Sequence, residues 1–246
     1  MNTHLDQLNS IIKPMRAPYI RPKDAATLIV IDRSGAIPKI LMGQRHKNSA
    51  FMPGKYVFPG GRVNASDSRA PALQDLLPAT CDKLMCNMKG KASPRRARAL
   101  LMAAIRETYE ETGLALGAPH EGKITSRSPD WSDYFKTGIA PKLDHFLFAA
   151  RAITPPGRPR RFDARFFIAD AGEITAHSPA LTSGDGELLD IAWLGFDEAM
   201  AKDIPLITRI ILQEIQDRLR DSNGWSPDFP VPFYYYKSNR FYRELL

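Results

Sequence analysis

Three glutamates stand close together near the middle of the chain, within residues 105–114 (IRETYEETGL). On a helix, which turns about 100° per residue, Glu107, Glu110 and Glu111 share one arc beside an apolar stripe. Like charges at such spacings destabilise a helix by about 0.2–0.5 kcal/mol per pair, so an opposite charge should compensate. Mg²⁺ suits this need, because it prefers carboxylate oxygens and leaves positions for waters and substrate phosphates.

A loop with two adjacent glycines precedes these glutamates in the chain, at residues 58–61 (FPGG). Glycine allows backbone angles that other residues avoid, and it lets the main chain approach a ligand closely. The loop is therefore a second place where chemistry is expected. Three glutamates alone usually form a solvated helix face, so the interpretation depends on both segments together.

Together these segments resemble the signature of the Nudix hydrolase superfamily, in which a glycine and a glutamate precede Arg-Glu-aliphatic-x-Glu-Glu-x-Gly-aliphatic. Residues 58–61 and 106–114 match its two ends. The resemblance implies that the carbonyl of Gly60 and the three glutamates bind Mg²⁺ or Mn²⁺, and that Arg106 orients Glu107 through a charge-assisted hydrogen bond. It makes four residues candidate catalytic groups: Arg106, Glu107, Glu110 and Glu111.

The chain departs from the signature between its two ends. Asp67 occupies the spacing of the first glutamate, residues 64–93 form an insertion, and Thr108 replaces the usual aliphatic residue. We expect Asp67 to support or bind the metal, with a role in capping a turn as the alternative. Glu187, in residues 183–187 (SGDGE), is a further candidate ligand, because the family often supplies a carboxylate from outside the signature. A simple turn is the alternative there.

A split signature of this kind is similar to the Nudix subgroup that includes mammalian peroxisomal coenzyme A diphosphatase. Residues 51–61 (FMPGKYVFPGG) and 161–167 (RFDARFF) carry that similarity. It implies coenzyme A or an acyl derivative as the substrate, with Arg45, Arg161 and Arg165 as candidate phosphate-binding residues. The chain ends in Glu-Leu-Leu, which is not a peroxisomal address, so only the chemistry is carried over.

Composition limits the class of protein. The chain has 246 residues, of which 43% are hydrophobic and 25% are charged, with a net charge of +7. These values are typical of a globular protein and exclude wholesale disorder and collagen-like repeats. Cys81 and Cys86 lack the spacing of a zinc site and cannot form a disulfide framework, so a reducing cytoplasm is expected. No apolar run is long enough to span a bilayer, and no membrane association is expected.

The elements expected around these residues belong to an α/β fold. Residues 25–32 and 40–45 are typical of paired strands, and residues 143–152, 164–169 and 188–194 of further strands. Ser93-Pro94 and Gly113 predict a helix over residues 94–112, and residues 206–219 have helical spacing. We predict one Nudix α/β/α sandwich with a mixed β-sheet and a core over residues about 25–222. The apolar patch 73–77 is expected to form a surface helix within the insertion.

The predicted function is metal-dependent hydrolysis of the diphosphate bond in a nucleoside diphosphate derivative. The enzyme alternatives are ADP-ribose, dinucleotide and nucleotide-sugar diphosphatases, and a non-catalytic Nudix-like nucleotide-binding module is the alternative outside enzymes. The basic segments 83–98 and 151–165 leave an RNA-processing pyrophosphatase open, although we do not expect nucleic acid as the substrate. The carboxylate that acts as general base is left open. The aromatic tail, residues 223–246, is expected to pack on the body or on a second subunit of a homodimer.

Overall fold

Strand β1 (Lys23–Asp32) lies at the centre of the fold and is covered on both sides. In this computed structural model, which describes residues 3–10, 20–49, 51–122, 124, 126, 128–178 and 187–246, the side chains of β1 alternate between two apolar cores. Leu28 and Val30 belong to one core, and Ile29 and Ile31 to the other. Successive side chains of a strand point to opposite faces, so β1 lies between two packed layers.

The main sheet is mixed, as predicted. Its order is β11 (Leu188–Gly195), β2 (Lys39–Arg45), β1, β9 (Phe162–Asp170), β8 (Leu147–Ile153), β12 (Pro232–Lys237) and β13 (Arg240–Leu245). The short strands β3 (Tyr56–Val57) and β4 (Gly60–Arg62) add to β2 and β1. β1 runs parallel to β9, and β8 to β12, whereas the other pairs are antiparallel. Two small sheets join β5 (Leu114–Leu116) to β10 (Ile174–His177) and β6 (Ala118–Pro119) to β7 (Ile139–Ala140).

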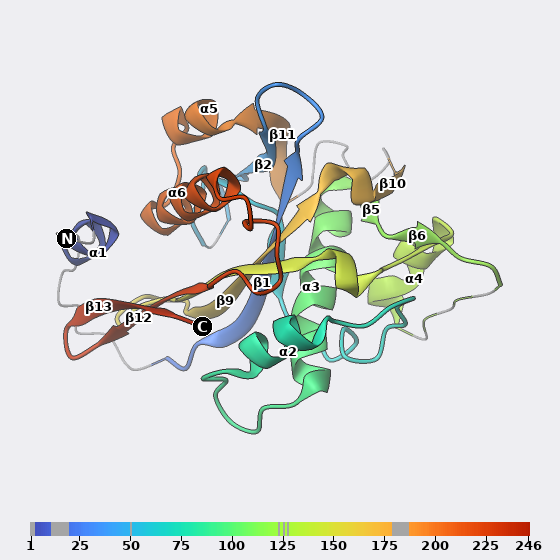
Figure 1. The fold of residues 1–246 in the computed structure, drawn as a ribbon, viewed down its shortest axis with the longest axis horizontal. Helices are drawn as coiled ribbons and strands as arrows, with labels where there is room; N and C mark the ends of the chain where they lie inside the picture. Colours follow the sequence, from blue (N-terminus) through green and yellow to red (C-terminus); the bar gives the residue numbers. More distant parts are fainter. Residues whose placement is uncertain are drawn as a thin grey trace.

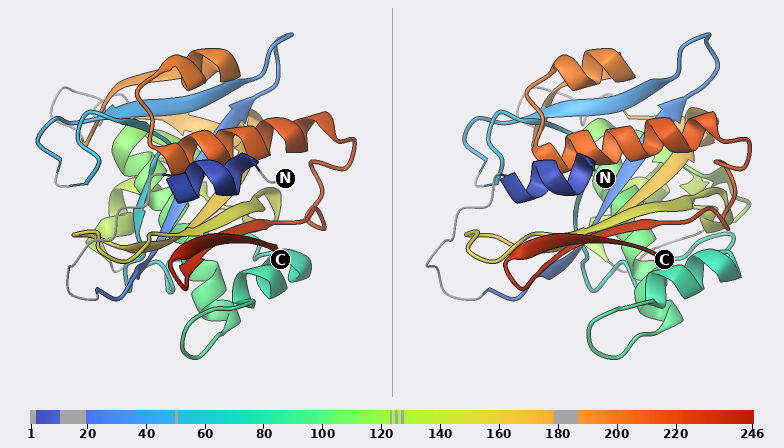
Figure 2. Two further views of the ribbon diagram at one scale, coloured as in Figure 1. Left: turned by 90° about the vertical axis from the view of Figure 1, so that its left-hand side faces the viewer. Right: turned by 60° about the vertical axis from the view of Figure 1, so that its left-hand side comes forward.

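Helices cover both faces of the main sheet (Figures 1 and 2). One face carries α2 (Pro78–Met85), α3 (Pro94–Thr112) and α4 (Pro129–Lys136). The other carries α1 (Thr3–Ser10), α5 (Phe196–Ala201) and α6 (Leu206–Arg220). The 3₁₀ turns η1 (Leu143–His145) and η2 (Ala171–Glu173) lie in connections, and η1 explains why β8 begins later than the predicted residue 143. The α/β/α sandwich is confirmed.

The helix with the three glutamates, α3, begins and ends where its sequence predicts. Ser93 caps it by accepting a hydrogen bond from the N–H of Arg96 at 3.3 Å, and Pro94 occupies the first helical position. At the other end Gly113 adopts φ +73, and a Cβ there would lie 2.3 Å from the carbonyl oxygen of Ser178. Only glycine fits that contact, so the helix ends at residue 112.

The insertion differs from the expectation. The patch 73–77 is not helical, and the helix begins at Pro78 instead. The pyrrolidine ring of a proline keeps the preceding residue out of the α region, and Leu77 has φ −58 and ψ 141. Ala70, Leu84 and Met88 are buried in the core under α3, so the insertion packs into the core and not only at the surface.

The aromatic tail also belongs to the fold. β12 and β13 form a hairpin that extends the main sheet beyond residue 222, and Tyr234 is completely buried. The guanidinium of Arg151 lies 4.4 Å from the ring centre of Phe233, a cation–π contact between β8 and β12. The tail therefore packs on the body of its own chain.

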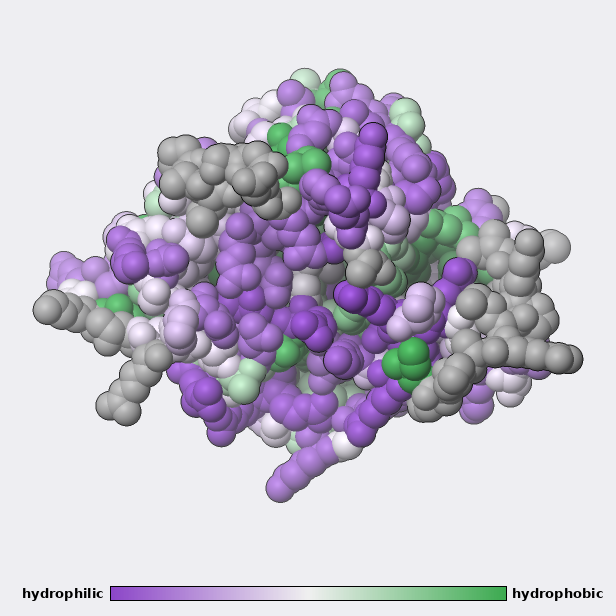
Figure 3. Space-filling view, turned by 180° about the vertical axis from the view of Figure 1, so that it is seen from behind, coloured by the Kyte–Doolittle hydropathy of each residue, from purple (hydrophilic) through white to green (hydrophobic). Residues whose placement is uncertain are grey.

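The surface seen from behind is mostly hydrophilic, and its hydrophobic residues form small separate patches (Figure 3). Within the described ranges, no helix has the length and apolar character needed to cross a membrane.

Replacing Phe233 with alanine should destabilise the protein by about 3–5 kcal/mol, because it removes a large buried side chain from the hairpin. Urea denaturation followed by circular dichroism measures this loss. Leu245→Ala, at a position that is 57% exposed in the same hairpin, is the matched control and should change stability by about 0.5 kcal/mol or less. Equal stability of Phe233→Ala and the unaltered protein would contradict a stabilising role of Phe233 in packing the tail.

Candidate active site

The glycine loop lies directly against α3, as predicted. The N–H of Gly60 donates to Oε2 of Glu111 at 2.9 Å. A Cβ on Gly60, whose φ is +154, would lie 2.5 Å from the carbonyl oxygen of Ala26, and one on Gly61 would lie 2.3 Å from the Glu107 carboxylate. The two glycines therefore allow β4 to sit between β1 and the glutamates. The role of the Gly60 carbonyl as a metal ligand stays a prediction.

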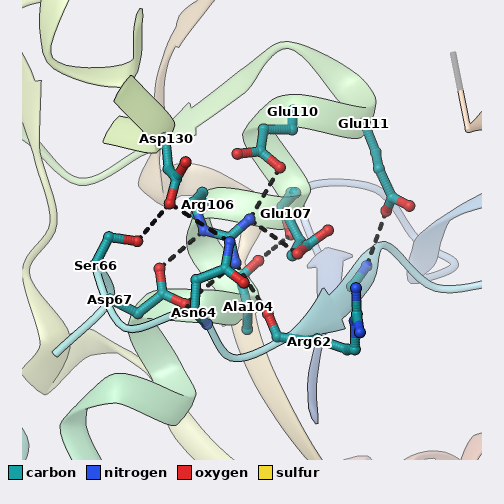
Figure 4. A network of polar contacts seen from close by, with 12 residues as sticks. Arg62, Asn64, Ser66, Asp67, Ala104, Arg106, Glu107, Glu110, Glu111 and Asp130 are labelled. Atoms are coloured by element: carbon teal, nitrogen blue, oxygen red, sulfur yellow. Dashed lines mark hydrogen bonds and ion pairs between the residues drawn. The ribbon is translucent and has the colours of Figure 1, made fainter. Parts of the chain in front are cut away.

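Arg106 is the centre of the polar network on α3 (Figure 4). Its side chain is only 2% exposed, and its Nη1 donates to Glu107 at 2.8 Å and to Glu110 at 3.0 Å. Its Nη2 donates to the carbonyl oxygen of Arg62 at 3.0 Å. Burial alone would lower the pKa of Arg106, but its carboxylate partners raise it, so the guanidinium stays charged. Arg106 thus makes the contact to Glu107 that the resemblance implied.

Asp67 holds the other side of Arg106. Its carboxylate is completely buried and accepts bonds from Nε of Arg106 at 2.8 Å and from Nη2 at 3.1 Å. It also accepts from the indole N–H of Trp131 at 3.0 Å and from the backbone N–H of Asn64 at 2.7 Å. Because its oxygens already accept these four hydrogen bonds, we correct the expectation that Asp67 could be a metal ligand. It acts on the site through Arg106.

The contribution of α4 is not foreseen from sequence. Trp131 fixes Asp67, and Asp130 accepts a hydrogen bond from the hydroxyl of Ser66 at 2.6 Å. Ser128-Pro129 is a helix-start signal that could have located α4, but nothing in the sequence indicates that it meets the loop around Asp67. These contacts tie the insertion, α3 and α4 together.

Glu187 and Arg45 lie at the edge of the glutamate cluster. They form an ion pair, and Nε of Arg45 also donates to the carbonyl oxygen of Phe51 at 2.9 Å. Burial is the main cause that raises the pKa of Glu111, and the charges of Glu107 and Glu187 raise it further. The structure thus brings Glu187 and Arg45 near the α3 carboxylates. Residues 183–186 of the same loop lie outside the described residues.

The other two predicted phosphate-binding arginines are buried away from solvent, which corrects that expectation. Arg165 is completely buried and donates to Asp24 and to the carbonyl oxygen of Asp163, both at 2.8 Å. Arg161 is 6% exposed and donates to the carbonyl oxygens of Thr154 at 2.9 Å and Ile20 at 2.7 Å. Their charges serve the interior of the fold and cannot meet a substrate that stays in solvent.

Part of the basic segment at residues 83–98 is structural in the same way. Lys83 donates to the carbonyl oxygens of Pro227 and Phe229, at 2.9 and 2.8 Å. Arg96 donates to the carbonyl oxygens of Lys89 and Lys91 and pairs with Asp24. Lys83 and Arg96 therefore hold loops in place, whereas Lys89, Lys91 and Arg95 of the same segment are exposed.

The three glutamates are unusually easy to protonate. Burial is the first cause for each, and it raises the pKa of Glu107 to about 7 against an ordinary 4.5. The pKa of Glu110 is raised, and that of Glu111 well above its usual range. In addition, Oε1 of Glu111 is buried without a hydrogen-bond partner. A carboxylate cluster in which Glu111 is buried with an unpaired oxygen needs a positive charge beside it.

The available donors fit Mg²⁺ or Mn²⁺, since all are oxygens. Glu107, Glu110 and Glu111 are the candidate ligands, with Glu187 at the edge. Within the described ranges, no three His, Cys, Asp or Glu side chains are already arranged around a single ion position.

No family model matches the chain. Acyl-coenzyme A diphosphatase NUDT19 of Gallus gallus is 36% identical to it over 107 residues, which cover 34% of this chain and 28% of that protein. The protein of the same name from Xenopus laevis is 22% identical over an alignment of 250 residues, which covers 72% of this chain and 63% of that protein. The chain thus matches less than two thirds of the length of either relative.

The fold agrees with a solved structure. The NUDIX hydrolase from Alicyclobacillus acidocaldarius superposes with a TM-score of 0.58 and 25% identity, covering 78% of this chain and 90% of that chain. The glycine loop, the arginine and the glutamates of α3 are the parts that the family signature requires, and the structure brings them together. In its fold, in its signature residues and in these likenesses, the chain is similar to the Nudix hydrolase superfamily.

Proposed function

We propose that this protein is a metal-dependent Nudix diphosphatase that hydrolyses coenzyme A or an acyl derivative of it. The observation that carries the reaction class is the contact of Gly60 with Glu111 and of Gly61 with Glu107, with one buried Glu111 oxygen left unpaired. A structural ion pair would leave no such oxygen. A solvated helix face would not bury it.

Each residue has a separate task in the proposed reaction. Glu107, Glu110 and Glu111 would hold Mg²⁺ or Mn²⁺, which neutralises the diphosphate and lowers the pKa of a bound water. Arg106 keeps Glu107 and Glu110 in fixed orientations, and Gly60 fixes Glu111 through its N–H. Hydrolysis adds the oxygen of water to one phosphorus and breaks its bond to the bridging oxygen, which leaves with the other phosphate.

The substrate class rests on different support. Both curated relatives are named acyl-coenzyme A diphosphatases. Residues 51–61, which resemble the coenzyme A diphosphatase subgroup, end in the glycine loop that contacts Glu111. Arg45 is partly exposed and lies near the glutamate cluster, so it is the candidate for contact with a substrate phosphate. Arg161 and Arg165 are excluded from that role by their burial.

A cytoplasmic location is part of the proposal, since Cys81 and Cys86 are both free thiols. A small nucleotide is the expected binding partner. Homodimer formation is not needed for any part of the site described above.

A screen with identified products tests the function. Coenzyme A, an acyl-coenzyme A, ADP-ribose, a dinucleotide and a nucleotide sugar are incubated separately with the protein and Mg²⁺ or Mn²⁺, and products are identified by mass spectrometry. We expect the coenzyme A compounds to have the highest kcat/KM. Faster hydrolysis of ADP-ribose or of a nucleotide sugar would retain the reaction class and contradict the substrate.

Activity should disappear in excess chelator and return with Mg²⁺ or Mn²⁺. Glu111→Gln should lower kcat by several orders of magnitude, because it removes a charge that would hold the cation. The folded content should not change, since a glutamine oxygen can still accept the N–H of Gly60. Steady-state kinetics and circular dichroism measure both effects. Full activity in chelator, or a matching loss of folded protein, would contradict the role of Glu111.

Stability of the metal-free protein should fall as pH rises. The pKa of Glu107 is about 7 in the folded state and near its ordinary 4.5 in the unfolded state, so the folded state binds the proton more tightly. The resulting stabilisation is fully present below about 4.5 and is lost as pH rises through about 7. Because the cation needs deprotonated carboxylates, the increase in Tm on adding Mn²⁺ should be larger at about pH 8 than at about pH 5. Scanning fluorimetry measures it, and a constant increase would count against this coupling.

Asp67→Asn should destabilise the protein by about 3–5 kcal/mol, because it leaves the buried Arg106 without its fully buried counter-charge. Mn²⁺ affinity should also fall, by roughly tenfold or more, since Arg106 would no longer fix Glu107 and Glu110. Urea denaturation and a Mn²⁺ titration at a temperature where the variant is folded provide the measurements. Asp133→Asn, at an exposed aspartate of α4, is the control and should alter neither. Unchanged stability and affinity would mean that Asp67 only caps a turn.

A further inference from the structure

β11 contains an irregularity next to the site. Leu188 and Leu189 pair with Arg45 and Gln44, but Ala192 pairs with Met42, so Asp190 and Ile191 together face Gly43. This is a β-bulge, a feature that often lies beside active sites and re-aims side chains. Asp190 takes φ +46, a left-handed conformation that glycine adopts far more easily. A strained residue that is not glycine needs something to hold it.

The bulge changes which side of the sheet the preceding residues face. A Cβ on Gly43 would lie 3.1 Å from Cβ of Leu188 and 3.4 Å from Cγ1 of Ile191, so both side chains lie on the same side of β2. Residues three apart on a regular strand face opposite sides. The extra residue therefore sets the direction in which Glu187, just before Leu188, leaves the strand.

Asp190 is held by a tyrosine from across the neighbouring strand. The hydroxyl of Tyr56 donates to the Asp190 carboxylate, and the ammonium of Lys202 lies 4.6 Å from the centre of the Tyr56 ring. Tyr56 is only 7% exposed, and its N–H donates to the carbonyl oxygen of Asp203 at 3.0 Å. β3 and β11 both pair with β2, so the bond from Tyr56 to Asp190 passes over β2.

Tyr56 and Asp190 are each close in sequence to a part of the site that lies outside α3. β3 continues through Phe58 and Pro59 to Gly60, whose N–H holds Glu111. β11 begins directly after Glu187, whose carbonyl oxygen accepts the N–H of His46 at 3.2 Å. A change in the bond between Tyr56 and Asp190 would therefore alter the separation of the glycine loop and Glu187.

We propose that Asp190 and Tyr56 form a clamp that positions Glu187 relative to the Gly60 loop and so determines how tightly the site holds its divalent cation. Neither residue touches the cation or the substrate, so both are positioning residues. The inference rests on the proposed function. The clamp would make cation affinity depend on residues of β3 and β11, in addition to the glutamates of α3.

Mn²⁺ binding to the full chain, measured by electron paramagnetic resonance of the free ion, tests the clamp without any substrate. Tyr56→Phe removes only the hydroxyl, and Asp190→Gly keeps the left-handed backbone while removing the carboxylate. We expect each to weaken Mn²⁺ binding by roughly tenfold, the scale of residues that orient metal ligands. Tyr235→Phe is the matched control, because it removes a similar bond to Glu244 in the C-terminal hairpin.

The double variant shows whether the effect passes through Glu187. In a Glu187→Gln background, Tyr56→Phe should cause little further loss, because coupled residues are not additive. Unchanged Mn²⁺ affinity in both single variants would overturn the clamp, and so would an equal loss in the Glu187→Gln background. Should Tyr56→Phe unfold, Asp190→Gly decides by the same criteria. A folded unaltered protein that binds no Mn²⁺ would overturn the proposed function and the clamp with it, whereas normal binding in every variant would overturn the clamp alone.

Discussion

The buried charge of Arg106 is the constraint on which the site depends. A guanidinium inside a protein is stable only when its charge and donors are matched, and losing one partner of such a pair is costly. Asp67 provides the fully buried match, while Glu107 and Glu110 each accept a hydrogen bond from Nη1 of Arg106. Two glutamates that would repel one another are therefore held close by one cation of the protein. Arg106 supplies too little positive charge for all three, and Glu111 keeps an unpaired oxygen.

The rest of the fold brings the backbone to this cluster. β1 is packed on both faces, and β4 pairs with it so that Gly60 lies opposite Thr27 and Gly61 opposite Ala26. Neither glycine could carry a side chain there, because a Cβ would collide with β1 or with Glu107. The aspartate at the place of the usual glutamate is accommodated by the insertion, whose Asn64 and the Trp131 of α4 complete its hydrogen bonds.

The sequence predicts the parts of this arrangement that depend on local signals. The bounds of α3 follow from Ser93, Pro94 and Gly113, and the strands β1, β2, β9 and β11 follow from short runs of β-branched, aromatic and other apolar residues. Such local signals do not predict which distant residues pack together. Arg161 and Arg165 stand in a basic segment that could equally face a phosphate or an aspartate, and only the fold buries them. Trp131 bonds to Asp67 although the two residues are 64 positions apart, and no local signal predicts that contact. Asp190 adopts a left-handed conformation in a β-bulge, but no glycine marks this position in the sequence.

A crystal structure of the protein soaked with Mn²⁺, with anomalous diffraction measured at the manganese edge, tests the central claim most directly. The account predicts an anomalous peak between the Gly60 loop and α3, within coordination distance of Oε1 of Glu111 and of Glu107, with the bonds from Arg106 to Asp67 intact. A peak at another place on the protein, or a glutamate cluster that stays empty at saturating Mn²⁺, would contradict it.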